Sequence, residues 1–134
     1  MSRQTFSGAF AKFGATLKNV QWSVSSINNN NELVVSLWAH HRDPAIKDAM
    51  VFSDSFDRWS GPGNNEFMTN VTRAHQESLP VRLIIVSTEE TQRVQSGEDA
   101  SRVKKRFSPR DDLIGKVMSI DGDRYTIRFV KEAR

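Results

Sequence analysis

Cysteine is absent from the sequence, and this absence removes several kinds of chemistry. Disulfide bonds, catalysis by a thiol and zinc sites built on cysteine are all excluded. A metal site would have to use histidine, aspartate and glutamate side chains instead. Without cysteine, redox chemistry gives no indication of the compartment in which the protein works.

Long apolar runs are also missing. No stretch approaches the about 20 consecutive apolar residues that a membrane-spanning helix needs, so we expect no membrane partner. Residues 1–17 contain separated phenylalanines and no uninterrupted apolar core, which is not the pattern of a signal peptide. We therefore expect the protein to be cytoplasmic.

Neither sign of charge is in large excess, because 19 lysines and arginines face 16 acidic residues and leave a net charge of +3. Such a charge permits a polyanionic partner without requiring one. At 134 residues, the chain can bury a core but is short for two typical domains. We expect a single domain over residues 1–134.

The segment from Asn19 to Arg42 has two alternating runs on either side of the asparagines at 28–31, which is the pattern of a β-hairpin. With these asparagines as the loop, Ile27 would lie opposite Glu32. One face would then be apolar, with cross-strand pairs Val20–Ala39, Trp22–Leu37 and Val24–Val35. The other face would carry Asn19, Gln21, Ser23 and Ser25 opposite His40, Trp38, Ser36 and Val34.

Trp38 is the large aromatic residue of this polar face. With Gln21 and His40 beside it, it could stack on a flat ligand while its neighbours bind the edge of that ligand. A solvent-facing or helix-covered sheet also carries lone tryptophans, and this is the commoner origin of such a residue. In the same register Trp22 belongs to the core.

Two helices are predicted to pack on the sheet. Apolar residues Phe6, Phe10, Phe13 and Leu17 form one helical stripe. A longer helix over residues 64–76 would bury Phe67, Val71 and Ala74, with Asn64 or Asn65 as its cap. We also expect a short helix after Asp43-Pro44, over residues 45–50, and then a loop with aromatic anchors over residues 51–65.

The remaining segments predict strands. Residues 81–86 are apolar on both faces, which indicates a central covered strand. Residues 114–120 and 124–130 form a second hairpin around Asp121-Gly122, with Tyr125, Ile127 and Phe129 on one face. Residues 87–110 would be a flexible connector within the domain. The predicted fold is α+β, with a mixed, curved or barrel-like sheet and at least two packed helices.

A basic cluster lies between residues 102 and 110, with Phe107 and Pro109 among its cations. Such a cluster can neutralise phosphates and release counterions, which supplies salt-sensitive affinity for nucleic acid. A solvated linker balanced by the preceding acidic residues explains the cluster equally well. Arg124 and Arg128 on the last strand would extend a binding surface, and Trp38 and Trp59 would stack on exposed bases.

We find no pattern of a catalytic site, a metal site or a cofactor site. Adjacent residues of a strand point to opposite faces, so His40 and His41 are not expected to share a metal ion. The acidic residues of the predicted loops, such as Asp54 and Glu66, show no spacing typical of a metal-dependent nuclease. We therefore expect a binding protein rather than an enzyme.

Several short motifs occur in an order that is similar to a known domain. They are the run Asn19–Val24 followed by Leu37-Trp38, then Asn64-Asn65-Glu66, the strand 81–86, Phe107-Ser108-Pro109 and the closing Asp-Gly hairpin. In this order they resemble the N-terminal, non-catalytic domain attached to some HNH-type bacterial endonucleases. The sequence departs from that family at Val24, where a second aromatic is usual, at His40-His41, where an acidic residue is usual, and in having no HNH module.

This resemblance implies a domain that reads or holds DNA, with or without a modified base, in a restriction-modification or phage-related setting. The first hypothesis is thus a small non-catalytic DNA-binding module, with DNA preferred to RNA. A protein-interaction or inhibitory adaptor is the alternative, and a metal-dependent nuclease is the third. The predicted nucleic-acid-binding residues are Gln21, Trp38, His40, Trp59, Arg102, Lys104, Lys105, Arg106, Arg110, Arg124 and Arg128.

Overall fold

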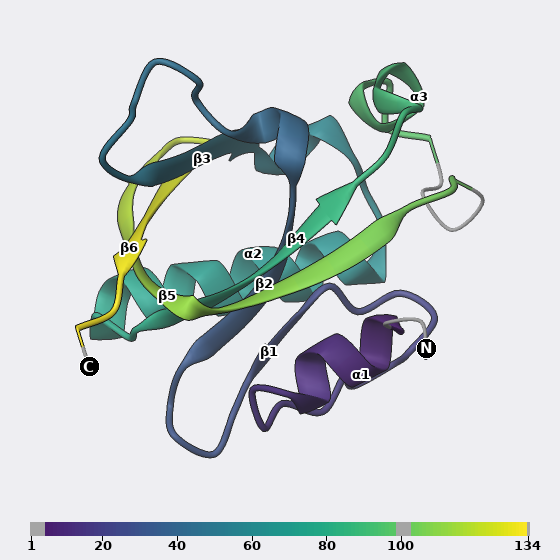
Figure 1. Cartoon of the computed structure of the whole chain (residues 1–134). Coiled ribbons are helices and arrows are strands. Elements are labelled where there is room, and N and C mark those ends of the chain that lie inside the picture. The colour runs from purple at the N-terminus through teal and green to yellow at the C-terminus, as the bar shows by residue number, and fades with distance from the viewer. Residues whose placement is uncertain (1–4, 99–102, 134) are drawn as a thin grey trace.

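A computed structural model describes residues 5–98 and 103–133 (Figure 1). It is an α+β fold in which a curved, six-stranded mixed sheet is not closed into a barrel. The strands are β1 (Ser25–Ile27), β2 (Leu33–Trp38), β3 (Met50–Ser55), β4 (Val81–Ser87), β5 (Arg106–Asp121) and β6 (Arg124–Lys131). The helices are α1 (Phe6–Ala11), α2 (Pro62–Glu77) and α3 (Thr91–Gln95), with 3-10 turns η1 (Ala39–His41) and η2 (Phe56–Arg58).

The sheet has the order β1-β2-β4-β5-β6-β3, with β2 and β4 parallel and every other pair antiparallel. Strand β5 is 16 residues long and joins the two halves, because it pairs with β4 through its first part and with β6 through its second. Gly115 of β5 faces the ring of Phe129, where a Cβ would lie 2.3 Å from Cδ1. Only glycine allows this close approach.

Helix α2 packs on one face of the sheet and confirms the predicted long helix (Figure 1). Phe67, Val71 and Ala74 are buried in the main core, as expected. The helix begins at Pro62, so the predicted asparagine cap is wrong. The Asn64 side chain instead donates from Nδ2 to the carbonyls of Phe56 and Trp59, at 2.7 Å and 2.8 Å.

Helix α1 covers the opposite face and confirms the predicted docking helix. Phe10 is fully buried against Val34 of β2 and Ile84 of β4, while the rings of Phe6 and Phe107 lie 5.0 Å apart. The central strand β4 is therefore covered on both faces, as its sequence predicted. The helix is shorter than the apolar stripe because the chain turns at Gly14, which has a φ of 70°.

The first hairpin forms, but its predicted register is wrong. Ile27 pairs with Leu33 and Ser25 pairs with Val35, so the pairing is shifted by one residue. The side-chain oxygen of Asn28 accepts hydrogen bonds from the backbone N–H groups of Asn30 and Glu32, at 3.0 Å and 2.9 Å. This local bonding draws Glu32 into the loop and shifts the register. Strand β1 has only three residues because residues 19–23 form a turn before it.

Two other predictions near the first hairpin are wrong. The segment after Asp43 forms a turn rather than a helix, with the Ala45 N–H bound to the Asp43 side chain at 3.0 Å. The predicted loop over 51–65 contains strand β3, which pairs with β6 through contacts such as Phe52 with Ile127. Because its partner strand β6 is distant in the sequence, no local pattern around residues 51–65 indicates that β3 forms.

The C-terminal hairpin is confirmed, with Gly122 at a φ of 60° and with Tyr125, Ile127 and Phe129 buried. Within residues 87–110 the structure places helix α3, a buried Val103 and the start of β5.

In the part of the chain that the structure describes, no helix is both long and apolar enough to cross a membrane.

Candidate functional site

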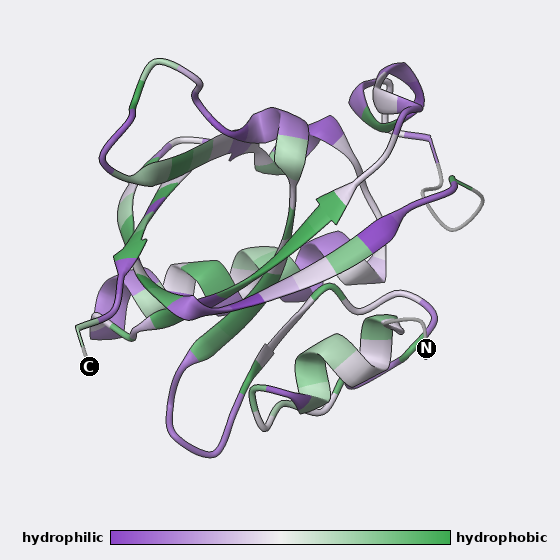
Figure 2. Ribbon diagram, viewed as in Figure 1, coloured by the Kyte–Doolittle hydropathy of each residue, from purple (hydrophilic) through white to green (hydrophobic). Residues whose placement is uncertain are grey.

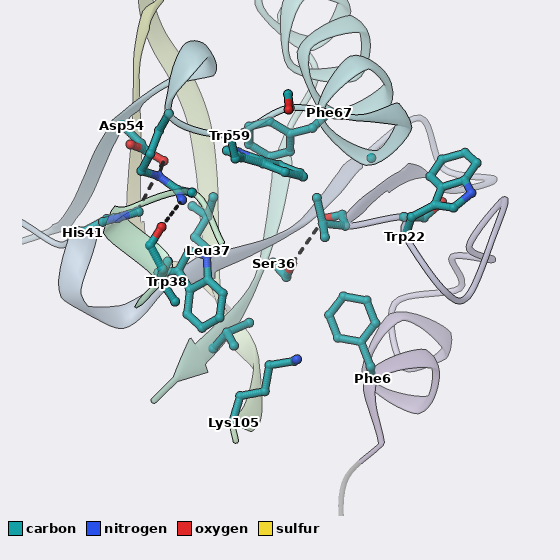
Figure 3. A pocket seen from close by; sticks show the side chains of 18 of the residues that line it. Phe6, Trp22, Ser36, Leu37, Trp38, His41, Asp54, Trp59, Phe67 and Lys105 are labelled. Carbon is teal, nitrogen blue, oxygen red and sulfur yellow. Dashed lines mark hydrogen bonds and ion pairs between the residues drawn. The ribbon is translucent and has the colours of Figure 1, made fainter. Parts of the chain in front are cut away.

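A pocket of about 900 Å³ opens at the carboxyl ends of β2 and β4 (Figure 3). It exists because β1 is short: β1 pairs with β2 only as far as Val35, although β2 continues to Trp38. The remaining edge is bordered by residues 20–24, by the segment before α2 and by the start of β5. Its volume lies within the range of ligand-binding cavities.

All three tryptophans of the chain line this pocket. Trp22 comes from the turn before β1, Trp38 from the end of β2 and Trp59 from the segment between η2 and α2, and each is half-buried. Trp59 packs on Phe67 at a ring distance of 6.5 Å. Figure 3 shows Trp38 and Trp59 on one side of the pocket and Trp22 on the other.

Trp22 corrects one prediction. The hairpin pattern predicts Trp22 in the core opposite Leu37, but Trp22 lies on a turn outside β1 and lines the pocket instead. The error follows from the shifted register and from the early end of β1. Trp22 therefore borders the pocket on the side opposite Trp38 and Trp59, and Figure 3 shows its indole ring pointing away from these two side chains.

One end of the pocket is polar and carries the carboxylate of Asp54, which is only 8% exposed. Its Oδ2 accepts a hydrogen bond of 2.7 Å from Nε of Arg58, whose Nη1 donates to the Val94 carbonyl at 2.8 Å. Within residues 5–98 and 103–133, no hydrogen bond reaches Oδ1 of Asp54. This oxygen is an acceptor for an N–H or O–H group of a ligand.

His40 and His41 lie next to this polar end. Both rings direct Nε2 at Oε1 of Gln95, and the ring centroids are 4.4 Å apart. The expectation that the two side chains point apart is wrong, because they belong to the 3-10 turn η1 rather than to a strand. Burial lowers the pKa of the His41 imidazole below its ordinary value of 6.5, against the opposing effects of Gln95 and Asp54.

The imidazole of His41 also lies near the carboxylate of Asp54. Nδ1 of His41 lies 3.6 Å from Oδ2 of Asp54, so the two side chains are close but do not form a hydrogen bond. Among the described residues, no group of three or more histidine, aspartate or glutamate side chains could hold an ion. Burial also raises the pKa of the Tyr125 phenol, which lines the pocket as a neutral group.

The predicted cations divide into two groups. Lys105 lines the pocket, while Lys104 and Arg106 are exposed next to it along the chain. Figure 2 shows hydrophilic residues over α3 and the first part of β5, beside the hydrophobic β4. Arg102 lies outside the described residues.

The other predicted cations are not at the pocket. Arg110 is held by Asp112 through two hydrogen bonds of 3.0 Å, and this carboxylate raises the pKa of the Arg110 guanidinium. Arg124 and Arg128 are exposed on β6 and do not line the cavity. Of the predicted residues, the pocket brings together Gln21, Trp38, Trp59 and Lys105, and His40 contacts Trp38 at a ring distance of 5.9 Å.

The polar end of the pocket is not predicted from the sequence. Asp54 and Arg58 are four residues apart, a spacing typical of ion pairs in a helical turn, but their segment was predicted to be a loop. Their meeting with His41 depends on strand pairs that are distant in sequence. No protein-family model, no curated protein and no solved structure gives a significant match to the chain.

Proposed function

We propose that this protein is a small non-catalytic DNA-reading module that holds one unpaired base in the tryptophan-lined pocket. The observation that carries the proposal is the convergence of Trp22, Trp38 and Trp59, from three separate segments, on one cavity with a carboxylate oxygen at its end. Aromatic faces with a few placed polar groups are typical of ligand-binding cavities.

The residues of the pocket supply the interactions that a base needs. Stacking of a base on an aromatic side chain contributes about 1–3 kcal/mol. Asp54 accepts a hydrogen bond from an amino group on the edge of the base, through the oxygen that Arg58 leaves unbound. Lys104, Lys105 and Arg106 supply positive charge for the phosphates beside the pocket.

A base inside a duplex cannot reach such a cavity, so the proposal requires a base that is already unpaired or is extruded. The cavity of about 900 Å³ has room for a substituent on that base. Together with the resemblance to domains attached to HNH-type endonucleases, this supports a cytoplasmic role in a restriction or phage-related setting. Recognition of DNA in preference to RNA is part of the same proposal.

The test is a salt titration of binding to a random duplex and to a single strand. Trp38→Ala should weaken binding to the single strand more than to the duplex, because it removes a stacking surface. Lys104→Ala should weaken binding to all sequences evenly and should reduce the dependence on salt. Arg73→Ala, on the exposed side of α2, is the control and should change neither. Absence of binding at low salt would overturn the proposal.

The same pocket supports one other function, that of a protein-interaction adaptor. Trp38 and Trp59 beside a buried carboxylate also suit a methylated ammonium group, which binds aromatic faces through cation–π contacts. A peptide with trimethyl-lysine distinguishes the two candidates. Tight binding of this peptide, without binding of DNA at low salt, would favour the adaptor.

A further inference from the structure

The turn over residues 19–23 presents an apolar side chain at the rim of the pocket. Val20, at its tip, is 68% exposed and is the most exposed large hydrophobic residue in the described ranges. Val20, Gln21 and Trp22 all line the cavity. The other two such residues, Met68 on α2 and Met118 on β5, do not.

This turn is held in one conformation by its own hydrogen bonds. The Asn19 side-chain oxygen accepts from the Gln21 N–H at 2.8 Å, and the Asn19 carbonyl accepts from Trp22 and Ser23 at 3.2 Å and 2.8 Å. The Asn19 N–H in turn donates to Oγ of Ser23 at 3.0 Å, and Ser23 is 1% exposed. The backbone that carries the exposed Val20 side chain is therefore held in one conformation.

Helix α2 supports the turn from the other side. The carbonyl of Trp22 lies so close to Gly63 that a Cβ at this position would be 2.2 Å from the oxygen. The turn is thus fixed to the amino end of α2, the longest of the described helices. A rigid element loses little conformational entropy when it binds.

We propose that Val20 enters the duplex and fills the space that a base leaves when it moves into the pocket. Extrusion costs a few kcal/mol of lost stacking, and apolar side chains inserted between base steps offset such a cost in proteins that deform DNA. Val20 and the tryptophans line one cavity, so the departing base and the side chain that replaces it are neighbours. Gln21, beside Val20, has an amide that can bind the edge of the base left without its partner.

This inference rests on the proposed function and is tested with three DNA probes of equal length. They are a fully paired duplex, a duplex with one bulged base and a single strand. Val20→Ser should weaken binding to the paired duplex about tenfold and leave the other two probes unchanged, since their base needs no extrusion. Met118→Ser, which removes an equally apolar exposed side chain on β5, is the matched control and should change none of them.

The outcomes distinguish the proposed insertion of Val20 into the duplex, with Val20 as a wedge, from the proposed DNA-reading function. If Val20→Ser leaves the paired duplex unaffected, or weakens all three probes equally, Val20 is not a wedge, although the module still binds DNA. If the unmodified protein binds none of the probes, the proposed function itself fails. Thermal unfolding of Val20→Ser should match that of the unmodified protein because the replaced side chain is exposed.

Discussion

Arg58 holds one oxygen of the Asp54 carboxylate and leaves the other oxygen to the pocket. Nε of Arg58 lies 2.7 Å from Oδ2 of Asp54, and Nη1 of the same guanidinium donates to the carbonyl of Val94 in helix α3. The orientation of Asp54 is therefore fixed by a residue that is itself anchored to another segment. A ligand meets a preformed acceptor at this end of the pocket.

Asp54→Asn should reduce base selectivity more than it reduces overall binding. The amide keeps the shape of the carboxylate but removes its charge, so an amino group on a bound base loses its strongest acceptor. We expect about a tenfold loss for single strands with adenine or cytosine at the unpaired position and a smaller loss for thymine. Binding to a panel of such strands measures this difference.

The matched control is Asp57→Asn, on the 3-10 turn η2 that directly follows β3, which is exposed and outside the pocket lining. It should leave the preference among the bases as it is. A uniform loss of binding across the panel in Asp54→Asn would show that Asp54 acts only through the stability of the pocket.

Gly63→Ala should displace the turn that carries Trp22. Its methyl group would meet the Trp22 carbonyl oxygen at 2.2 Å, so either the turn or the start of α2 must move. Overpacking of this kind costs about 1–3 kcal/mol of unfolding free energy. Urea unfolding followed by tryptophan fluorescence measures the loss and reports the environment of the turn at the same time.

Asn65→Ala serves as the control for Gly63→Ala, because Asn65 is an exposed residue of the same helix. Its stability should change by less than about 0.5 kcal/mol. An unchanged unfolding free energy for Gly63→Ala would contradict the close approach of Trp22 to the helix.

Arg82→Met should destabilise the fold at the end of the sheet away from the pocket. Arg82 binds Glu32 of the first hairpin loop and Glu132 after β6, each at 2.8 Å, and Glu132 contributes most to raising the pKa of its guanidinium. Without Arg82, both carboxylates lose their shared cation in a partly buried site. We expect a loss of about 2–4 kcal/mol by chemical denaturation.

The exposed pair of Arg73 and Glu77 on α2 provides the comparison, with a similar distance of 2.9 Å. Because solvent screens this pair, Arg73→Met should cost less than about 1 kcal/mol. Equal losses in the two variants would mean that burial does not strengthen the Arg82 interactions.

The stability of the protein should fall as the pH drops below 6.5, in part through His41. The pKa of this imidazole is lowered in the folded state by burial, so the unfolded chain takes up a proton more readily. The contribution of His41 is complete above its ordinary pKa and is lost as the pH falls through the lower folded value. Unfolding free energies at several pH values above and below 6.5 measure the slope.

His41→Asn should flatten this part of the pH profile. His75→Asn, at an exposed position on α2, should leave the profile as it is. If both variants keep the slope of the unmodified protein, His41 does not carry the pH dependence.

Local signals in the sequence predicted the parts of the fold whose contacts are local. The Asp121-Gly122 turn, the apolar strand 81–86 and the stripe of Phe67, Val71 and Ala74 on α2 all had a pattern within a few residues, and all three form. The first hairpin had the right elements but the wrong register, because a single side chain, Asn28, completes its loop.

The pocket was only partly predictable. Trp38 and Trp59 were singled out because tryptophan is a good stacking surface, and both line the cavity. Asp54 and Trp22 were not, because β3 gives no local pattern and the turn before β1 depends on its contact with α2. What decides the site is the meeting of segments that are distant in the sequence.

Helix α1 is the first described element along the chain, yet each strand on which it packs is made later. Val34, Ile84 and Phe107 belong to β2, β4 and β5, so its docking surface is complete only when most of the chain has left the ribosome. Contacts that close such long loops form late in folding. The first helix to be synthesised therefore completes its packing late, and its apolar side stays exposed to solvent until β5 has been made.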